Sequence, residues 1–356
     1  MNVSSEMKDW CGQIAKRLKE YSGVDILIPF DLDSAGGALG FREFAQHVRG
    51  EPNSVKIYYA GDQDESSQSR NVFSEFKLAS KMEKFDSTTY KQDPKRAVVF
   101  IDFCNPKDKR FGFSEKLIPD FVIDHHGADG TENYPEKTFI LNEAIGSAST
   151  LVVEMLFAVD YKFDSNDAMI AAKSLALGVY TDTLELLMAY MRDLEAHLEM
   201  RRFFRENEFR DLATLQLSEK FLDHLAAFIS NLGVKDQSIV SGIGFIKKDD
   251  RSSMFEIANQ VIKSSSVNLV AVWAVIDDQV NVVVRSEKES KGGKNLDTFL
   301  KKCFGSRFAG GRLVADFWQG GAQFPLDKII QLWNAEGKED LIQKQVDAFV
   351  KEKIFH

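Results

Sequence analysis

Hydrophobic and polar positions in the first half of the chain predict strands that alternate with helices. Short apolar runs rich in β-branched and aromatic residues predict strands at 24–30, 54–60, 97–102 and 120–124. Longer stretches with apolar residues at helical spacing predict helices at 34–48, 71–85, 147–159 and 166–181, besides an amphipathic helix near the N-terminus. Strands that alternate with helices predict an α/β domain whose mostly parallel sheet is flanked by helices.

The second half of the chain predicts a smaller α/β domain with a mixed sheet. The charged stretch 186–232 predicts two helices that end at a Gly233 cap and join the domains. Beyond it, the pattern predicts strands and helices that alternate, at 238–246, 253–264, 267–277, 279–286, 295–304 and 338–353. We therefore expect a first domain at 1–195, a helical linker at 196–234 and a second domain at 235–356.

Composition narrows the function classes. Of the 356 residues, 28% are charged and the net charge is −9, which disfavours duplex nucleic acid as a partner because phosphates require a basic face. No apolar run approaches the roughly 18 residues that a membrane span needs. The three cysteines are isolated from one another, as in a reduced protein, so we expect a cytoplasmic location.

Acidic residues and histidines follow the predicted strands at the ends where ligands bind in parallel sheets. Asp31 and Asp33 follow the first strand, Asp102 ends the third, and the fourth runs into Asp124, His125 and His126; Asp182 follows an apolar helix. Carboxylates with one or two imidazoles suit Mn²⁺, Mg²⁺ or Fe²⁺. Each single aspartate could instead cap a helix or a turn, but the set together favours a metal site.

The same residues resemble the motifs of the DHH phosphoesterase family. The segments "DLDSAGGAL" (31–39), Asp102 in "VVFIDF", "DHH" (124–126) and "GVYTDT" (178–183) follow the family order. Farther on, "VVRS" (283–286) and "AGGRLVADFWQGG" (309–321) resemble the DHH-associated C-terminal domain. The resemblance is to stand-alone two-domain members, similar to nano-RNases and oligoribonuclease-type phosphodiesterases.

This resemblance implies a role for each residue of the cluster. It implies a two-metal centre, with Mn²⁺ the expected ion, in which Asp102 bridges and Asp33, His125 and Asp182 complete one metal site. Asp31 would belong to the other metal site. Asp124 would orient His125, and His126 would face the substrate phosphate, which makes Asp124 and His126 the catalytic pair.

Two positions depart from the family pattern. Many members have a metal-binding histidine two or four residues before the first aspartate, where this chain has Pro29 and Leu27. Ser34 stands where the first motif usually has glycine. These departures put in question whether the metal site next to the first motif holds an ion.

The glycine-rich tract of the second half supplies candidate substrate-binding residues. Glycine backbone can approach an anion closely, and arginine forms forked hydrogen bonds to phosphate. The candidates are Arg285, Ser286, Gly310, Gly311, Arg312, Gly320 and Gly321. The alternative is that these glycines only form tight turns between strands.

We therefore expect a metal-dependent phosphodiesterase that hydrolyses short linear ribonucleotides, such as dinucleotides, to mononucleotides. The alternatives of the same superfamily are a cyclic-dinucleotide phosphodiesterase, a 3′-phosphoadenosine-5′-phosphate phosphatase, and an exopolyphosphatase or pyrophosphatase, against which the glycine-rich tract argues. An alternative of another class is a non-catalytic nucleotide-binding protein with a degraded first metal site. A homodimer is one option for its assembly.

Overall fold

The computed structural model describes most of the chain, in two compact units. The described residues are 1, 3–51, 54–61, 67–105, 108, 110–112, 117–126, 134–214, 218–264, 266–287, 295–314, 317–329 and 339–355. Unit 1 comprises Met1–Asp64 and Gln68–Thr214, and unit 2 comprises Glu65–Ser67 and Leu215–His356. The domain boundaries that we predicted at residues 195 and 234 remain predictions.

Unit 1 is built on a parallel sheet, as the alternation of strands and helices predicted. Its strand order is β3-β2-β1-β4-β5-β6, and every pairing is parallel. The strands are β1 (Gly23–Pro29), β2 (Val55–Ala60), β3 (Glu83–Lys84), β4 (Arg96–Ile101), β5 (Phe121–Asp124) and β6 (Phe139–Asn142). The order reverses between β1 and β4, which is the point where open α/β sheets bind ligands.

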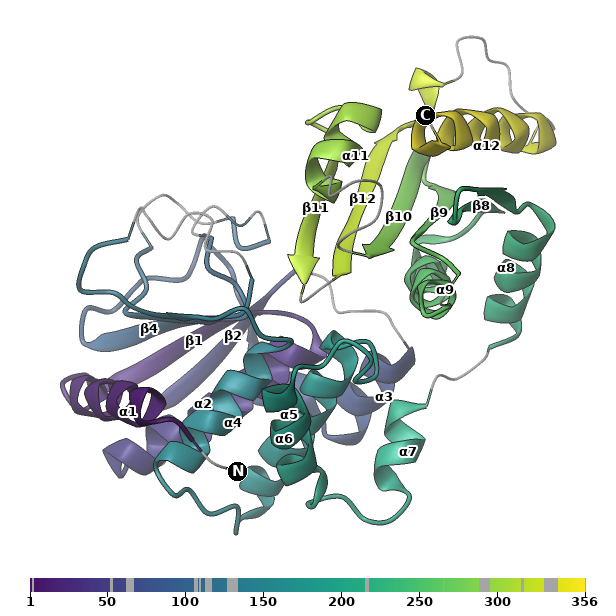
Figure 1. The fold of residues 1–356 in the computed structure, drawn as a ribbon. Coiled ribbons are helices and arrows are strands. Elements are labelled where there is room, and N and C mark those ends of the chain that lie inside the picture. Colours follow the sequence, from purple (N-terminus) through teal and green to yellow (C-terminus); the bar gives the residue numbers. More distant parts are fainter. Residues whose placement is uncertain are drawn as a thin grey trace. The chain divides into compact units, whose positions relative to one another are not determined.

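Helices cover one face of this sheet (Figure 1). They are α1 (Ser5–Leu18), α2 (Leu32–Arg49), α3 (Ser67–Glu75), α4 (Ala148–Ala158), α5 (Asn166–Asp182), α6 (Met191–Arg201) and α7 (Glu208–Ala213). The amphipathic α1 is confirmed, because Cys11, Ile14 and Leu18 are buried on one side of it. On the opposite face, the described residues that pack on the strands come largely from loops, with Phe103 stacked on both Phe100 and Phe111.

Glycines allow α2 and α5 to lie against each other and against α4. A Cβ atom on Gly36 would lie 2.7 Å from the Ser174 carbonyl oxygen. A Cβ atom on Gly178 would lie 2.6 Å from Ser149 Oγ and 3.0 Å from Asp33 Cα. Larger residues at these positions would push apart the two helices that carry Asp33 and Asp182.

Three local predictions for this half of the chain were wrong. The helix expected at 71–85 starts at Ser67 and ends at Glu75, and a 3₁₀ turn (Leu78–Lys81) and the edge strand β3 follow. Strand β6, a four-residue strand at the edge of the sheet, was missed. The stretch 186–232 forms three helices rather than two, and Gly233 starts strand β7 instead of capping a helix.

Unit 2 has the predicted mixed sheet, in the order β11-β12-β10-β9-β8-β7. Its strands are β7 (Gly233–Lys235), β8 (Ser238–Phe245), β9 (Leu269–Ile276), β10 (Gln279–Glu287), β11 (Ala309–Val314) and β12 (Phe317–Pro325). Only the β8–β9 pairing is parallel. Helices α11 (Leu296–Phe304) and α12 (Glu339–Phe355) pack on one face, and α8 (Glu219–Ser230) and α9 (Ser252–Ile262) lie on the other.

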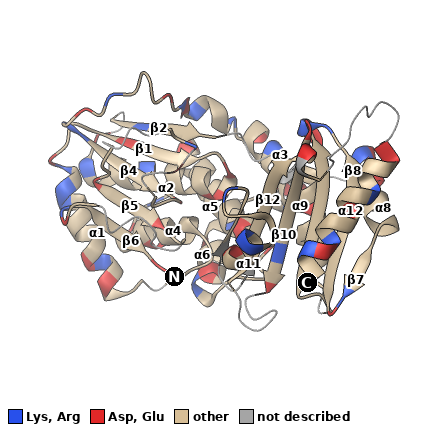
Figure 2. Ribbon diagram, turned by 90° about the horizontal axis from the view of Figure 1, so that it is seen from above, with Lys and Arg blue, Asp and Glu red and all other residues tan. Residues whose placement is uncertain are grey.

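Charged side chains lie mainly on the outer helices. Figure 2 shows acidic and basic residues interspersed on α1 and on α12, whose buried sides are apolar. Among the described residues, no helix combines the length and the apolar character that crossing a membrane would require.

Candidate metal centre

The predicted cluster forms at the carboxyl ends of β1, β4 and β5. Asp31 and Asp33 lie where β1 passes into α2, Asp102 follows β4 directly, and Asp124 ends β5. His125 and His126 follow Asp124, and Asp182 is the last residue of α5. The structure therefore brings together residues that are as much as 151 positions apart in the sequence, from Asp31 to Asp182.

His125 lies at the centre of the cluster. Its Nε2 atom is 3.2 Å from Asp102 Oδ1, 3.1 Å from Asp182 Oδ2 and 3.8 Å from Asp33 Oδ2. Its Nδ1 atom lies 3.1 Å from the carbonyl oxygen of Ile145, which can only accept a hydrogen bond. In the neutral ring, Nδ1 therefore carries the proton and Nε2 keeps a lone pair for a metal ion.

The donor atoms fit a divalent cation. Two sets of residues bring ligand atoms within 4.8 Å of one another, Asp33–His125–Asp182 and Asp102–His125–His126. Asp102 Oδ1 and His125 Nε2 are buried and have no hydrogen-bond partner among the described residues, although they face each other. Buried polar atoms are normally satisfied, so this pair fits a divalent cation as its partner. Carboxylates with imidazole suit Mn²⁺ or Fe²⁺, and Mg²⁺ less well.

Asp33 is held by the start of helix α4. Its carboxylate accepts hydrogen bonds from Ser147 Oγ (2.5 Å), the Ala148 amide (2.8 Å) and the Ser149 amide (2.9 Å). Burial, together with the negative charge of Asp182, nevertheless raises the pKa of Asp33 to about 6. The donors fix the position of this carboxylate without fully offsetting the cost of burying its charge.

Asp102 adopts a backbone conformation that is unusual for a non-glycine residue. Its φ of 64° is left-handed, a region that aspartate tolerates better than most residues. Ser34 Oγ donates a 2.6 Å hydrogen bond to Asp102 Oδ2, so the serine that departs from the family motif holds one oxygen of the expected bridging ligand. Burial and the nearby Asp31 raise the pKa of Asp102 well above its usual range.

Asp31 caps a helix and also belongs to the cluster. Its carboxylate accepts a 2.9 Å hydrogen bond from the Ser34 amide at the start of α2. Burial raises its pKa, and the charge of Asp182 adds to that effect. Asp31 is not in either set of candidate ligands found among the described residues. The capping alternative therefore holds for Asp31, and its role as a metal ligand remains a prediction.

The expected role of Asp124 toward the His125 ring is corrected by the structure. Asp124 Oδ1 lies 2.8 Å from Nδ1 of His126 and accepts the backbone amide of His125 at 2.9 Å. The Ile145 carbonyl takes the place at the His125 ring, because strand β5 directs Asp124 toward the second histidine. Burial would raise the pKa of Asp124, but the bond to His126 outweighs it and lowers the pKa to about 2.

Arg110 is a candidate functional residue that the sequence did not reveal. Its guanidinium pairs with Asp108, at 2.6 Å, and the charges of Asp31 and Asp102 also act on it. A Cβ atom on Gly61, which directly follows β2, would lie 3.4 Å from the Arg110 side chain. A cation beside a carboxylate cluster can bind an anionic substrate, but its loop has no motif that marks it.

In unit 2, the four glycines lie inside strands, so the turn alternative is wrong. Gly310 pairs with Gly321 and Gly311 with Gly320 across β11 and β12. A Cβ atom on Gly320 would lie 2.6 Å from Leu300, and one on Gly321 would lie 2.3 Å from the Val282 carbonyl oxygen. Close packing therefore accounts for at least two of the glycines without a ligand.

The polar candidates of unit 2 lie on β10 and β11. Arg285 is buried, and its Nε donates a 2.8 Å hydrogen bond to Asn259. Ser286 Oγ donates to the Asn268 carbonyl at 3.1 Å. Arg312 lies on β11 opposite Gln319, and its side chain is outside the described residues. The substrate-binding role of these residues remains a prediction.

The structure is that of an α/β protein with a candidate metal centre at the switch point of its parallel sheet. No family model and no curated protein matches the sequence. The structure is similar to that of an exopolyphosphatase-related protein from Bacteroides fragilis, with a TM-score of 0.67 and 16% identity over 99% of this chain and 98% of that one. This likeness is one of fold.

Two further solved structures have lower scores. One is the DHH domain of a protein described as a member of a family of ribosomal proteins, with a TM-score of 0.48 and 13% identity over 98% of this chain and 92% of that one. The other is RecJ in complex with Mn²⁺ from Thermus thermophilus, with a TM-score of 0.42 and 13% identity over 99% of this chain and 55% of that one.

Proposed function

We propose that this protein is a metal-dependent phosphoesterase whose reaction takes place at the cluster around His125. The observation that carries the proposal is the buried pair Asp102 Oδ1 and His125 Nε2, which face each other at 3.2 Å without a hydrogen bond. A structural histidine would satisfy both ring nitrogens, and a structural aspartate would pair its oxygens with donors.

The roles that we propose follow the geometry and the family resemblance. Asp33, His125 and Asp182 hold one ion, Asp102 is shared, and Asp31 lies on the side of a second ion. Bound ions would supply Lewis-acid activation of water and neutralise charge on the phosphate. His126, whose Nδ1 is held by Asp124, is positioned to interact with a phosphate oxygen, and Arg110 adds a positive charge nearby.

We propose a short linear ribonucleotide as the substrate and manganese as the ion. The net charge of −9 disfavours a long polyanion, and unit 2 carries the residues that would bind the far nucleotide. Those residues are Arg285, Ser286, Gly310, Gly311, Arg312, Gly320 and Gly321. A substrate that also uses its remote end gains binding that can be expressed in the transition state.

A second candidate is hydrolysis of a phosphoanhydride such as polyphosphate. It is favoured by the fold likeness to a protein described as exopolyphosphatase-related, which extends over 98% of that chain. The argument that the glycine-rich tract makes against this candidate remains a prediction.

The test is a turnover screen of the full chain with Mn²⁺. It compares a linear dinucleotide, longer RNA, a cyclic dinucleotide, bis-phosphorylated adenosine and polyphosphate, each also with excess chelator. We expect the dinucleotide to be cleaved fastest and the chelator to abolish turnover. Fastest turnover of polyphosphate would replace the first candidate by the second, and chelator-resistant turnover would refute a metal-dependent reaction.

Two variants localise the activity. Asp102→Ala should abolish turnover, because it removes the carboxylate that the family resemblance implies the two ions share. Arg312→Ala should lower dinucleotide turnover by roughly ten- to a hundredfold if it makes a charged hydrogen bond of about 1.5–3 kcal/mol. It should leave a mononucleotide-like reporter ester almost unaffected, and equal losses would mean that Arg312 supports the fold.

A further inference from the structure

The segment that joins β6 to α4 contacts two candidate metal ligands at once. The Ile145 carbonyl oxygen lies 3.1 Å from Nδ1 of His125. The next three residues after Gly146 supply the hydroxyl and the two amides that hold Asp33. A displacement of this segment, residues 143–149, would therefore move both His125 and Asp33.

Asp193, in the first turn of α6, holds this segment from within. Its side chain is fully buried, at 0% exposure. One carboxylate oxygen accepts the Gly146 amide at 3.1 Å and the Tyr190 amide at 2.8 Å, and the other accepts Thr150 Oγ1 at 2.5 Å. Gly146 lies between Ile145 and Ser147, so Asp193 is attached at the midpoint of the segment.

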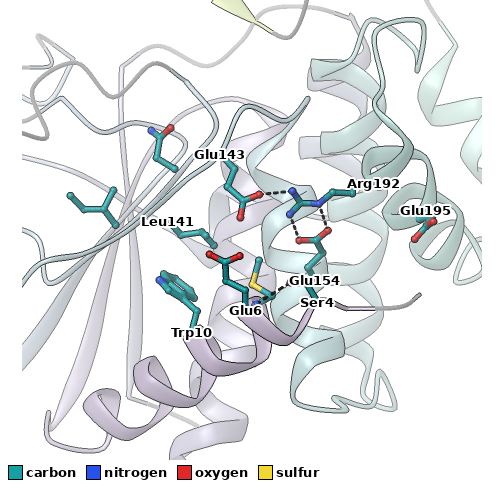
Figure 3. Close-up of a pocket in the computed structure, with 11 residues that line it drawn as sticks. Ser4, Glu6, Trp10, Leu141, Glu143, Glu154, Arg192 and Glu195 are labelled. Atoms are coloured by element: carbon teal, nitrogen blue, oxygen red, sulfur yellow. Dashed lines mark hydrogen bonds and ion pairs between the residues drawn. The ribbon is translucent and has the colours of Figure 1, made fainter.

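The neighbouring Arg192 holds the start of the same segment from outside. Figure 3 shows its guanidinium between the carboxylates of Glu143 and Glu154, beside a pocket of about 500 Å³. Arg192 Nε lies 2.7 Å from Glu154 Oε1. The first turn of α6 thus contacts the segment on both sides of Ile145.

Asp193 could be only a helix cap, since an acidic residue in the first turn commonly accepts an amide of the capping residue. The bond from Tyr190 is of that kind. The other two bonds reach residues 47 and 43 positions away, in the segment and in α4, and no cap needs them.

We propose that Asp193 is a positioning residue for the metal centre, which it serves by fixing segment 143–149 and through it His125 and Asp33. The inference rests on the metal binding that the proposed function requires. Partners of metal-binding histidines contribute strongly to affinity, and loss of one typically costs about 10- to 100-fold. Asp193 acts one contact farther out, on the carbonyl and amides that hold the ligands.

The close fit at Gly146 gives a second way to disturb the same contact. A Cβ atom there would lie 2.5 Å from Asp193 Oδ2 and 2.6 Å from Thr183 Cγ2. Gly146→Ala would therefore push the segment away from Asp193 while leaving the carboxylate in place.

The experiment measures Mn²⁺ affinity of the metal-free full chain by calorimetric titration, with folding checked by circular dichroism. Asp193→Ala should weaken Mn²⁺ binding by about tenfold or more, and Gly146→Ala should weaken it as well. Asp193→Asn should recover most of the affinity. Its amide oxygen can accept Gly146 and Tyr190, and its NH₂ group can donate to Thr150 Oγ1, because a hydroxyl also accepts.

Ser165→Ala is the matched control. Ser165 caps α5 by accepting the Ala168 amide at 3.0 Å, and that 17-residue helix ends at Asp182, roughly 25 Å away. The substitution removes the cap of α5, a helix that ends at a candidate metal ligand, but it does not touch segment 143–149. The Mn²⁺ affinity should therefore remain unchanged.

The outcomes separate this inference from the proposed function. A wild-type protein that binds no Mn²⁺ would overturn both. Tight binding by the wild type and equally tight binding by folded Asp193→Ala would overturn the positioning role alone. That role would also fall if Ser165→Ala lost as much affinity as Asp193→Ala, or if Asp193→Asn gave no recovery.

Discussion

Removing divalent ions should make the folded state less stable as the pH rises from 5 to 8. In the metal-free protein, several buried carboxylates lie around His125, and raising the pH ionises them without a cation to neutralise the charge. Asp33 has a pKa raised to about 6, and burial also raises the pKa of Asp102 and of Asp31. The folded state therefore holds protons that the unfolded chain has already released.

The direction and size of this loss of stability follow from the difference between the numbers of protons that the folded and unfolded states bind. A pKa that moves from 3.8 to about 6 costs about 3 kcal/mol once the group is ionised, at about 1.4 kcal/mol per pKa unit. That cost builds up between pH 3.8 and about 6, so roughly 1.4 kcal/mol of it falls between pH 5 and 8. His125 acts in the same direction, because its pKa is also raised, by Asp102 and Asp182 against the opposing effect of burial. Asp124 has a lowered pKa of about 2 and acts only in acid, well below this range.

For a domain of this size, about 1.4 kcal/mol corresponds to a fall in Tm of roughly 3–6 °C. The assay is thermal unfolding followed by circular dichroism at several pH values, with chelator and with excess Mn²⁺. Mn²⁺ should restore stability most at pH 8, by about 2.7 kcal/mol at a hundredfold excess over Kd. A metal-free Tm that stays constant or rises between pH 5 and 8 would refute the charge crowding inferred for the cluster.

Three further outcomes test other features of the structure. Gly178→Ala should destabilise unit 1 by about 1–3 kcal/mol, because the new Cβ would lie 3.0 Å from Asp33 Cα; unchanged thermal unfolding would contradict the close helix packing. Glu185→Gly should stabilise the protein, since φ is 60° at this exposed position, whereas Glu195→Gly inside α6 should cost about 1 kcal/mol in the same assay. Arg110→Gln should raise KM for a phosphate substrate about tenfold or more with unchanged Mn²⁺ affinity; a loss of Mn²⁺ affinity would instead make Arg110 part of the support of the metal centre.

The parts of the fold that could be predicted are those where burial acts on long, regular segments. Strand β1 is buried along its whole length, and Val24 and the run Ile26–Ile28 give it a strong apolar pattern. Helix α1 shows a single apolar stripe. In both elements, the buried positions are apolar and regularly spaced. This periodicity can be recognised in the sequence without knowledge of the tertiary contacts.

The parts that could not be predicted depend on contacts with distant segments. Strand β3 has only two residues, and it exists because Tyr58 and Tyr59 of β2 pair with it. For the glycine tract, the sequence left turns between strands as the alternative to substrate binding, because glycine is common in turns. In the structure, Leu300 of α11 lies too close to Gly320, and the Val282 carbonyl too close to Gly321, for a side chain to fit, and nothing local in the sequence encodes that closeness.

The candidate site was predictable to the extent that the sheet determines it. Residues at the carboxyl ends of parallel strands must meet, so Asp33, Asp102 and His125 could be grouped before any coordinates were known. Asp193 and Arg110 could not, because each reaches the site from a helix turn or loop whose path is set by packing. The one available signal was "GSAST" at 146–150, where serine at a helix start indicates a cap and, by its amides, an anion-binding terminus.

That terminus is filled by Asp33, an anion of the protein itself, and this bears on what the site can bind. The Ala148 and Ser149 amides and the Ser147 hydroxyl are all used by one carboxylate. They hold Asp33 in place but are not free to cradle a substrate phosphate. Among the described residues near the cluster, the groups suited to an anion are His126 and Arg110, and the negative charges there outnumber them. A phosphate could therefore approach only when cations have first neutralised the carboxylates, so metal binding should precede substrate binding.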